Sequence, residues 1–345
     1  MPKPLRVAIA GCHRMLDRTP ANHNWAAAFA AVPETELVAV FDKGADTRAA
    51  FVNCWGDLPA YADYERMLQD VSPEIVCIAT RQTRHADQIE LAAAAGVQGI
   101  LCDKPLATSL GEVARIVAAA ERSGIRFAFG LDRRWVTYYD TLGALIQDGA
   151  IGEVRSVAAY GLVNLINHGC HWYDRVLAFA GDAEIAWVSG RVDPLLGEPA
   201  DSRRRLDPPG SCQIQFANGV QAFVTAAGYV KGFDPGFDVI GSRGRLTVVS
   251  DGVDTGIWSL GEDEKTPVAR ALPPIKPVPH WPRAVQDLVS AIRDGHPTRC
   301  DIAHARRATE IGFVVHQSDR QGGRRIAPAE VDPNLRVASF PWGNE

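Results

Sequence analysis

Short apolar runs alternate with longer amphipathic stretches along the first third of the chain. The apolar runs have the length of buried strands and lie at residues 5–11, 36–42, 73–80, 97–102 and 125–130. The amphipathic stretches predict helices at residues 23–32, 63–69, 85–95 and 109–123. Strands that alternate with helices in this way predict an α/β fold with a doubly wound parallel sheet.

The pattern changes after residue 130, where strand-length runs become more frequent. One further helix is predicted at residues 136–147, and strands follow at residues 154–162, 211–216, 220–226, 237–240 and 245–249. The dipeptide Asn218-Gly219 predicts a tight hairpin turn. We therefore expect a second, α+β domain with an open, mainly antiparallel sheet, and we place the two domains at residues 1–131 and 132–345.

The remaining segments are less regular. Two late helices, at residues 280–294 and 301–317, are expected to pack back against one of the domains. The polar stretch 193–209 has the composition of a surface loop. The proline-rich connector 267–282 is expected to lack regular structure.

Composition limits the class of protein. The 345 residues are 46% hydrophobic and 22% charged, as in soluble globular proteins. The net charge of −5 gives no electrostatic reason to expect nucleic acid or an anionic membrane as a partner. Seven scattered cysteines fit reduced thiols in a cytoplasm. The chain runs from its first residues directly into a strand, so no signal peptide is expected.

Polar side chains follow the predicted parallel strands where each strand ends. They are Gly11, Asp42, Thr80 with Arg81, Asp103 with Lys104, and Asp132 with Arg133. The carboxyl ends of parallel strands share one edge of the sheet, where ligands bind in open α/β folds. Pro105 restrains Lys104 to an extended or turn conformation at this edge.

The first strand, helix and second strand form a βαβ unit that suggests a dinucleotide site. Asp42 ends the second strand, in place to bind the hydroxyls of a ribose. The glycine-rich fingerprint is incomplete, because Gly11 is followed by Cys12, His13 and Arg14 with no further glycine. By itself this motif fits a plain α/β turn almost as well.

A second group of candidate residues opens an apolar helix. His168, His171 and Asp174 lie at intervals of three, so His171 and Asp174 share a helix face. The group could hold a metal, but we expect none, because the family resemblance described next accounts for the same residues without one. A packed, hydrogen-bonded role for His171 is the alternative.

Together these residues resemble the Gfo/Idh/MocA family of NAD(P)-dependent oxidoreductases, over nearly the whole chain. The resemblance rests on the strand–helix order, the Gly11-to-Asp42 spacing, and residues 80–85, 102–105, 132–134, 169–174 and 241–244. It implies a Rossmann domain followed by an α+β domain whose open sheet often mediates oligomerisation. It also implies oxidation or reduction of a carbinol–ketone pair on a sugar, cyclitol or related compound.

The resemblance also implies roles for individual residues. The family's catalytic lysine maps onto Lys104 and its helix histidine onto His171. Its catalytic aspartate maps onto Asn167, whose amide cannot accept a proton. A histidine, with a reference pKa of about 6.5, is the easier base at neutral pH, so we expect His171 to be the acid/base and Lys104 to polarise the oxygen. The two roles could be exchanged.

The other site residues are expected to bind the two ligands. Substrate contacts are expected from Asn167, Arg133, Trp135 and Trp172. Cofactor contacts are expected from Gly11, His13, Arg14, Asp42, Thr80, Arg81, His85, Asp103 and Lys104. NAD is the expected cofactor because an acid at position 42 repels a 2′-phosphate, while Lys43 and Arg14 keep NADP open.

Three functions remain open at this point. The first is an NAD(P)-dependent dehydrogenase acting on CH–OH groups of a sugar, sugar acid, cyclitol or glycoside. The second is a redox-neutral glycosidase or lyase that uses NAD transiently, and the third is a nonenzymatic regulator that binds a dinucleotide or sugar. The expected partners are a carbohydrate-like small molecule and further copies of the chain in a dimer or tetramer.

Overall fold

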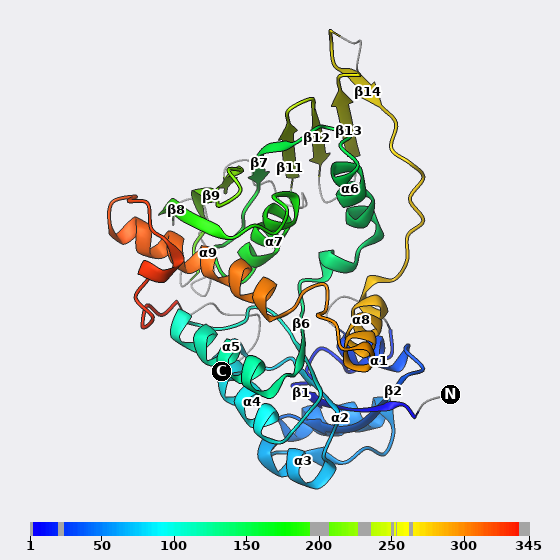
Figure 1. Cartoon of the computed structure of the whole chain (residues 1–345). Coiled ribbons are helices and arrows are strands. Elements are labelled where there is room, and N and C mark those ends of the chain that lie inside the picture. The colour runs from blue at the N-terminus through cyan, green and yellow to red at the C-terminus, as the bar shows by residue number, and fades with distance from the viewer. Residues whose placement is uncertain are drawn as a thin grey trace. The chain divides into compact units, whose positions relative to one another are not determined.

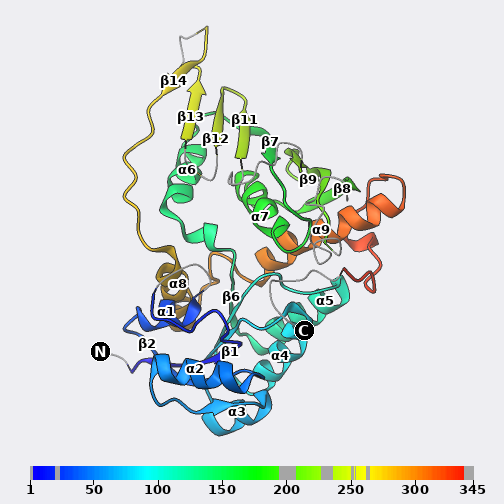
Figure 2. The same cartoon turned by 180° about the vertical axis from the view of Figure 1, so that it is seen from behind.

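The computed structural model describes residues 3–19, 24–193, 207–226, 236–249, 252, 254–261 and 265–337. The chain divides into two compact units. The first unit consists of Met1–Ala107, Gly111–Trp135 and Pro279–Ala305, and the second of Thr108–Leu110, Val136–Val278 and Arg306–Glu345. Each unit is built around one β-sheet (Figures 1 and 2).

The first unit holds a six-stranded, wholly parallel sheet, as the alternation of strands and helices predicts. Its strands are β1 (Leu5–Ala10), β2 (Thr35–Phe41), β3 (Ala60–Tyr61), β4 (Ile75–Ile78), β5 (Gly99–Cys102) and β6 (Arg126–Phe129). Their order in the sheet is β3-β2-β1-β4-β5-β6. The order reverses between β1 and β4, which is the position where ligands bind in doubly wound sheets.

Five helices connect these strands: α1 (Trp25–Ala30), α2 (Ala45–Trp55), α3 (Tyr64–Val71), α4 (Gln82–Ala94) and α5 (Leu110–Ser123). Right-handed crossovers place α1 and α2 on one face of the sheet and α3, α4 and α5 on the other. Helix α2 escaped sequence prediction because it has no continuous apolar face: Phe51 is its one buried residue.

The first unit also includes α8 (His280–Asp294), which the predicted boundary at residue 131 had assigned to the second domain. This helix packs against α1, β5 and β6 (Figure 1). The packing is close, because a Cβ atom on Gly99 of β5 would lie 2.6 Å from Ile292 Cδ1. After the strands of the second sheet, the chain therefore returns to the first unit, where the apolar face of α8 packs against α1, β5 and β6.

The second unit holds an eight-stranded sheet in the order β14-β13-β12-β11-β7-β10-β9-β8. Its strands are β7 (Val154–Tyr160), β8 (Ile185–Val192), β9 (Gly210–Phe216), β10 (Gln221–Thr225), β11 (Gly236–Gly241), β12 (Gly244–Val249), β13 (Asp254–Ser259) and β14 (Val268–Arg270). Only β7 and β10 pair in parallel, so the mainly antiparallel sheet is confirmed. Helices α6 (Thr137–Gln147), α7 (Gly169–Phe179) and α9 (Ile302–Arg320) accompany it.

Two predictions for the irregular segments need correction. The proline-rich connector, expected to lack regular structure, contains the short strand β14, and this strand pairs with β13. The three residues of β14 include no proline, so their backbone N–H groups are available for pairing. The stretch expected as a surface loop lies outside the described residues from position 194 to 206, but Asp207 at its end is buried.

One face of the second sheet carries several exposed apolar side chains. Among them are Tyr160, Phe223, Ile240 and Trp258, each between 41% and 46% exposed, and the strand registers place these four on the same side. A polar network lies among them.

That polar network is centred on Asp238. Its carboxylate accepts hydrogen bonds from the Tyr160 hydroxyl at 3.1 Å and the Thr247 hydroxyl at 2.6 Å, and Arg245 Nη2 lies 2.7 Å away. Burial acts to raise the pKa of Asp238, but these hydrogen bonds outweigh it and hold the pKa below its usual value.

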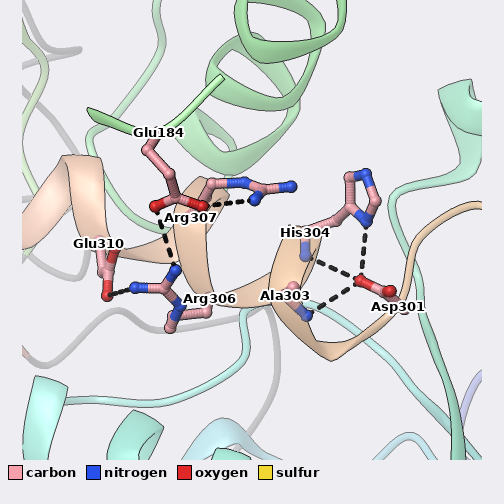
Figure 3. Close-up of polar contacts among 7 residues, drawn as sticks. All are labelled: Glu184, Asp301, Ala303, His304, Arg306, Arg307 and Glu310. Atoms are coloured by element: carbon pink, nitrogen blue, oxygen red, sulfur yellow. Dashed lines mark hydrogen bonds and ion pairs between the residues drawn. The ribbon is translucent and has the colours of Figure 1, made fainter. Parts of the chain in front are cut away.

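Polar contacts fix the beginning of α9 (Figure 3). Within the first unit, Asp301 Oδ1 accepts hydrogen bonds from the backbone N–H groups of Ala303 at 2.9 Å and His304 at 3.0 Å. Within the second, Arg306 and Arg307 both bind the Glu184 carboxylate, which precedes β8. These contacts stabilise the helix start and its attachment to the second sheet.

Candidate cofactor and substrate sites

The tips of β1 and β4 approach each other closely at Gly11. This residue has a positive φ of +86°, and a Cβ atom on it would lie 2.7 Å from the backbone nitrogen of Thr80. Its N–H donates to the Phe41 carbonyl at 2.8 Å, which ties the same turn to the end of β2. Only glycine combines this conformation with this approach, so the one glycine that the fingerprint retains is required by the geometry.

Asp42 lies at the end of β2, and backbone N–H groups of two turns bind its carboxylate. Its Oδ2 accepts the backbone N–H of Cys12 at 3.0 Å, and its Oδ1 accepts that of Gly44 at 2.9 Å. Arg48 Nη1 donates to the Asp42 carbonyl at 2.6 Å. Each carboxylate oxygen has room for about two hydrogen bonds, so the half-buried side chain keeps acceptor capacity for a sugar diol.

The loop after β1 presents His13 and Arg14 as exposed side chains. Arg81, the residue before α4, is half-buried and has extended backbone. These three residues therefore lie at the ends of β1 and β4, the edge where the sequence predicts the dinucleotide.

His85 lies behind this edge. Its side chain is fully buried, with Nε2 3.1 Å from the Thr80 carbonyl and Nδ1 3.1 Å from the Leu106 carbonyl. The Cys102 thiol is 3.4 Å from Nδ1. Burial lowers the pKa of His85 although these carbonyls oppose the shift, so the ring is neutral and its one N–H serves one carbonyl at a time. His85 thus supports the loop of residues 103–107, and its direct contact with the cofactor stays a prediction.

That loop carries Asp103 and Lys104. Asp103 is 8% exposed, and its Oδ1 accepts the backbone N–H of Lys104 at 2.9 Å. Gly130 fits against it, because a Cβ there would lie 3.0 Å from the same oxygen. The Lys104–Pro105 peptide bond is cis, and Lys104 is half-buried. The acid thus organises the loop that carries Lys104.

The two substrate residues predicted just after β6 differ in accessibility. Trp135 is 1% exposed and its Nε1 donates to Asp287 Oδ2 at 3.0 Å. Its ring therefore anchors the short helix of Asp132–Trp135 on α8, and its contact with the substrate stays a prediction. Arg133 is half-buried and lies 3.9 Å from Asp132 in a loose ion pair.

The candidate substrate residues of the second unit begin α7. Asp207 is buried and accepts the backbone N–H groups of Ile166 and Asn167, both at 2.8 Å. Asn164 donates its amide to His168 Nδ1 at 3.1 Å. His171 follows in the first turn of α7 and is 7% exposed. A carboxylate forty residues away thus fixes the backbone of the loop from which Asn167 and His171 emerge.

Two neighbours on α7 have structural roles. Trp172 is 5% exposed and donates its Nε1–H to the Tyr160 carbonyl at 2.8 Å, and its contact with the substrate stays a prediction. Asp174 forms a buried ion pair with Arg175 at 2.6 Å. Among the described residues no cluster of three metal-binding side chains occurs, here or elsewhere.

The comparison with known proteins identifies the first unit. The sequence model of an oxidoreductase family with an NAD-binding Rossmann fold, GFO_IDH_MocA, matches residues 5–131. The Rossmann domain belongs to the Gfo/Idh/MocA family. The expected NAD-binding character is therefore confirmed at the level of this family domain.

Two relatives of this chain are named for reactions on sugars. D-apiose dehydrogenase of Paraburkholderia graminis is 36% identical over 117 residues, 34% of this chain and 31% of that enzyme. The chain thus aligns with less than half of that relative's length. The dTDP-3,4-didehydro-2,6-dideoxy-alpha-D-glucose 3-reductase of Saccharopolyspora spinosa is 28% identical over 265 residues, 72% of this chain and 75% of the reductase.

Solved structures share the fold of both units. An oxidoreductase from Agrobacterium radiobacter, in complex with NAD+, L-tartaric acid and magnesium, superposes with a TM-score of 0.78. The match covers 95% of this chain and 99% of that one at 18% identity, so it is a likeness of fold. No helix among the described residues combines the length and the apolar character needed to cross a membrane.

Sequence reasoning missed two polar residues, Cys12 in the first unit and Asp207 in the second. Cys12 reaches Asp42, and Asp207 holds the loop before α7. Cys12 gave a weak signal, since it follows Gly11 directly in the fingerprint. Asp207 gave none, because its partners are forty residues away in the sequence.

Proposed function

We propose that the protein is an NAD(P)-dependent dehydrogenase that transfers a hydride between the nicotinamide and a carbinol or ketone carbon of a sugar, sugar acid, cyclitol or glycoside. The observation that carries the proposal is the Asp42 carboxylate, held at the end of β2 beside the Gly11 turn in a family NAD-binding domain. The sugar-directed names of the relatives support the substrate class.

The residues present fit the cofactor. The Asp42 carboxylate has acceptor capacity for the ribose diol, and the turn at Gly11 brings the β1 and β4 tips within backbone contact. Thr80 and Arg81 extend the same edge. When bound there, the nicotinamide supplies the hydride acceptor or donor.

In the oxidative direction the carbinol carbon loses a hydride and its hydroxyl loses a proton. We assign the proton to the imidazole of His171, and we assign Lys104 to polarise the oxygen and stabilise its developing negative charge. Asn167 is the substrate-orienting amide. Asp207 supports both second-unit residues through the loop that it binds.

A panel of sugars, sugar acids, cyclitols and glycosides, incubated with NAD or NADP, tests the proposal. Net formation of reduced cofactor with at least one substrate is the expected result. Product without net reduced cofactor would instead identify a redox-neutral glycosidase or lyase. Cofactor binding without turnover of any compound would favour a nonenzymatic regulator. This outcome is included because the amide of Asn167 cannot accept a proton.

We further propose that copies of the chain associate through the exposed face of the second sheet. Exposed apolar side chains on that face, among them Tyr160, Phe223, Ile240 and Trp258, form a patch of the kind that marks interaction sites. A cytoplasmic location and the choice between dimer and tetramer stay predictions.

A further inference from the structure

Cys12 binds the same carboxylate oxygen of Asp42 twice. Its backbone N–H lies 3.0 Å from Asp42 Oδ2, and its thiol sulfur lies 3.7 Å from that oxygen. The sulfur is also 3.9 Å from the Thr47 carbonyl in α2. Cys12 is fully buried, so its side chain points into the turn between β2 and α2 rather than toward the ligand edge.

We propose that Cys12 is a positioning residue for cofactor selection, which holds the Asp42 carboxylate in the orientation that accepts a ribose diol and excludes a 2′-phosphate. This inference rests on the proposed function only insofar as that function requires NAD. It adds a residue that the glycine fingerprint does not specify.

The hydrogen-bond count explains how the orientation is set. The single S–H of Cys12 lies nearer to Oδ2 than to the Thr47 carbonyl. With the thiol directed at Oδ2, that oxygen accepts two bonds from Cys12, which uses its ordinary capacity, while Oδ1 accepts one bond from Gly44. Oδ1 is therefore the oxygen that retains a lone pair for a ribose hydroxyl. The backbone N–H groups of Cys12 and Gly44 place one bond on each oxygen, and the thiol adds a second bond to Oδ2. This second bond restrains rotation of the carboxylate away from an incoming phosphate, so charge repulsion is retained.

The thiol is suited to this role because it stays protonated. Burial raises the pKa of Cys12, and the negative charge of Asp42 raises it further. A protonated thiol donates to the carboxylate, whereas a thiolate would repel it. An S–H group is a weak donor, so its removal is expected to have a moderate effect.

The test compares Cys12→Ala and Cys12→Ser by measuring equilibrium dissociation constants for NAD and NADP. Cys12→Ala removes the side-chain donor and keeps the backbone N–H. It should lower the ratio of the NADP to the NAD dissociation constant by about threefold to tenfold. Cys12→Ser restores a donor and should return the ratio to within about twofold of the wild type.

The same substitution in an Asp42→Ala background separates positioning from general loss of structure. Without the carboxylate, Cys12→Ala should change the ratio by less than about twofold, because the interaction that couples the two residues is gone. Cys54→Ala, which removes a partly exposed thiol from α2, is the matched control and should leave the ratio unchanged. Thermal unfolding of each variant checks that it is folded.

Unchanged selectivity in Cys12→Ala, or an equal loss of affinity for both cofactors, would overturn the inference. An effect of the same size in the Asp42→Ala background would overturn it as well. Failure of the wild type to bind either cofactor would reject the proposed function itself. Cofactor binding without turnover would still allow the dissociation constants for NAD and NADP to be compared. Failure of the inference about Cys12 and failure of the proposed function are therefore distinguishable.

Discussion

The Nε2 atom of His85 lies 3.1 Å from the carbonyl oxygen of Thr80, and the opposite side of the same buried ring faces Leu106. One side chain thus joins the tip of β4 to the loop that carries Lys104. Removing it leaves the buried carbonyl groups of Thr80 and Leu106 without the one N–H donor that they share. His85→Ala is expected to destabilise the first unit by about 1–3 kcal/mol and to lower kcat more than it raises KM for NAD.

Thermal unfolding and steady-state kinetics measure these two effects. His296→Ala, at an exposed histidine of the same unit, is the control that should change neither. A His85→Ala enzyme with wild-type kcat would show that the loop keeps its conformation without the histidine.

Asp42→Ala should weaken NAD binding far more than NADP binding. The wild-type carboxylate offers charged hydrogen bonds to the ribose diol and repels a phosphate at the same place. The loss expected for NAD is about tenfold to a hundredfold, as measured by titration with each cofactor. Equal losses for the two cofactors would remove Asp42 from the ribose site.

Lys104→Ala and His171→Ala should each reduce turnover by about 10²- to 10⁴-fold, the range for loss of a positioned acid or base. The NAD dissociation constant should stay close to the wild-type value, because the proposed ribose contact is that of Asp42. Single-turnover kinetics and NAD titration check both parts. Normal turnover after His171→Ala would mean that the base is another residue.

Asn167→Asp completes that experiment. It should be tolerated better than either alanine variant, and an increase in turnover of simple polyols would show that a carboxylate at this position adds to catalysis. If the wild type has no measurable turnover and none of these substitutions changes a rate, the protein binds its ligands without chemistry.

The exposed face of the second sheet predicts association of the chain. Phe223→Asp combined with Ile240→Asp introduces two charges into that face and should convert the oligomer to a monomer, as measured by light scattering. Leu16→Asp changes an exposed apolar residue of the first unit and should leave the mass unchanged. A wild type that is monomeric at micromolar concentration would refute the proposed interface.

His316 of α9 should make the protein sensitive to acid. Burial, with a further contribution from Arg320, lowers the pKa of His316 to about 4, below the value of about 6.5 for an unfolded chain. Between these values the unfolded state binds a proton that the folded state does not. The free energy of unfolding should therefore fall as the pH decreases from about 6.5 to about 4, by up to about 1.4 kcal/mol per pH unit.

His316→Gln cannot titrate and should show a shallower decrease over this range in denaturant unfolding. His296→Gln, at an exposed position, should keep the wild-type slope. An unchanged slope in His316→Gln would assign the acid sensitivity to other groups.

The sequence by itself determined the parallel first sheet and the strand ends that form its ligand edge. Apolar runs and helical spacing reflect contacts within a few residues, so Gly11, Asp42 and Lys104 could be placed at strand ends from their neighbours alone. The loss of a proton acceptor at Asn167 was equally readable, because it depends on residue type.

Only the tertiary structure decided which polar and aromatic residues face a ligand and which face the core. His85, Trp135 and Trp172 lie among plausible ligand-binding residues in the sequence, yet each is buried on a partner that other segments supply. The partners of Cys12 and Asp207 are thirty and forty residues away. Burial and hydrogen-bond partners arise when distant segments pack together, and the spacing of neighbouring residues in the sequence does not predict that packing.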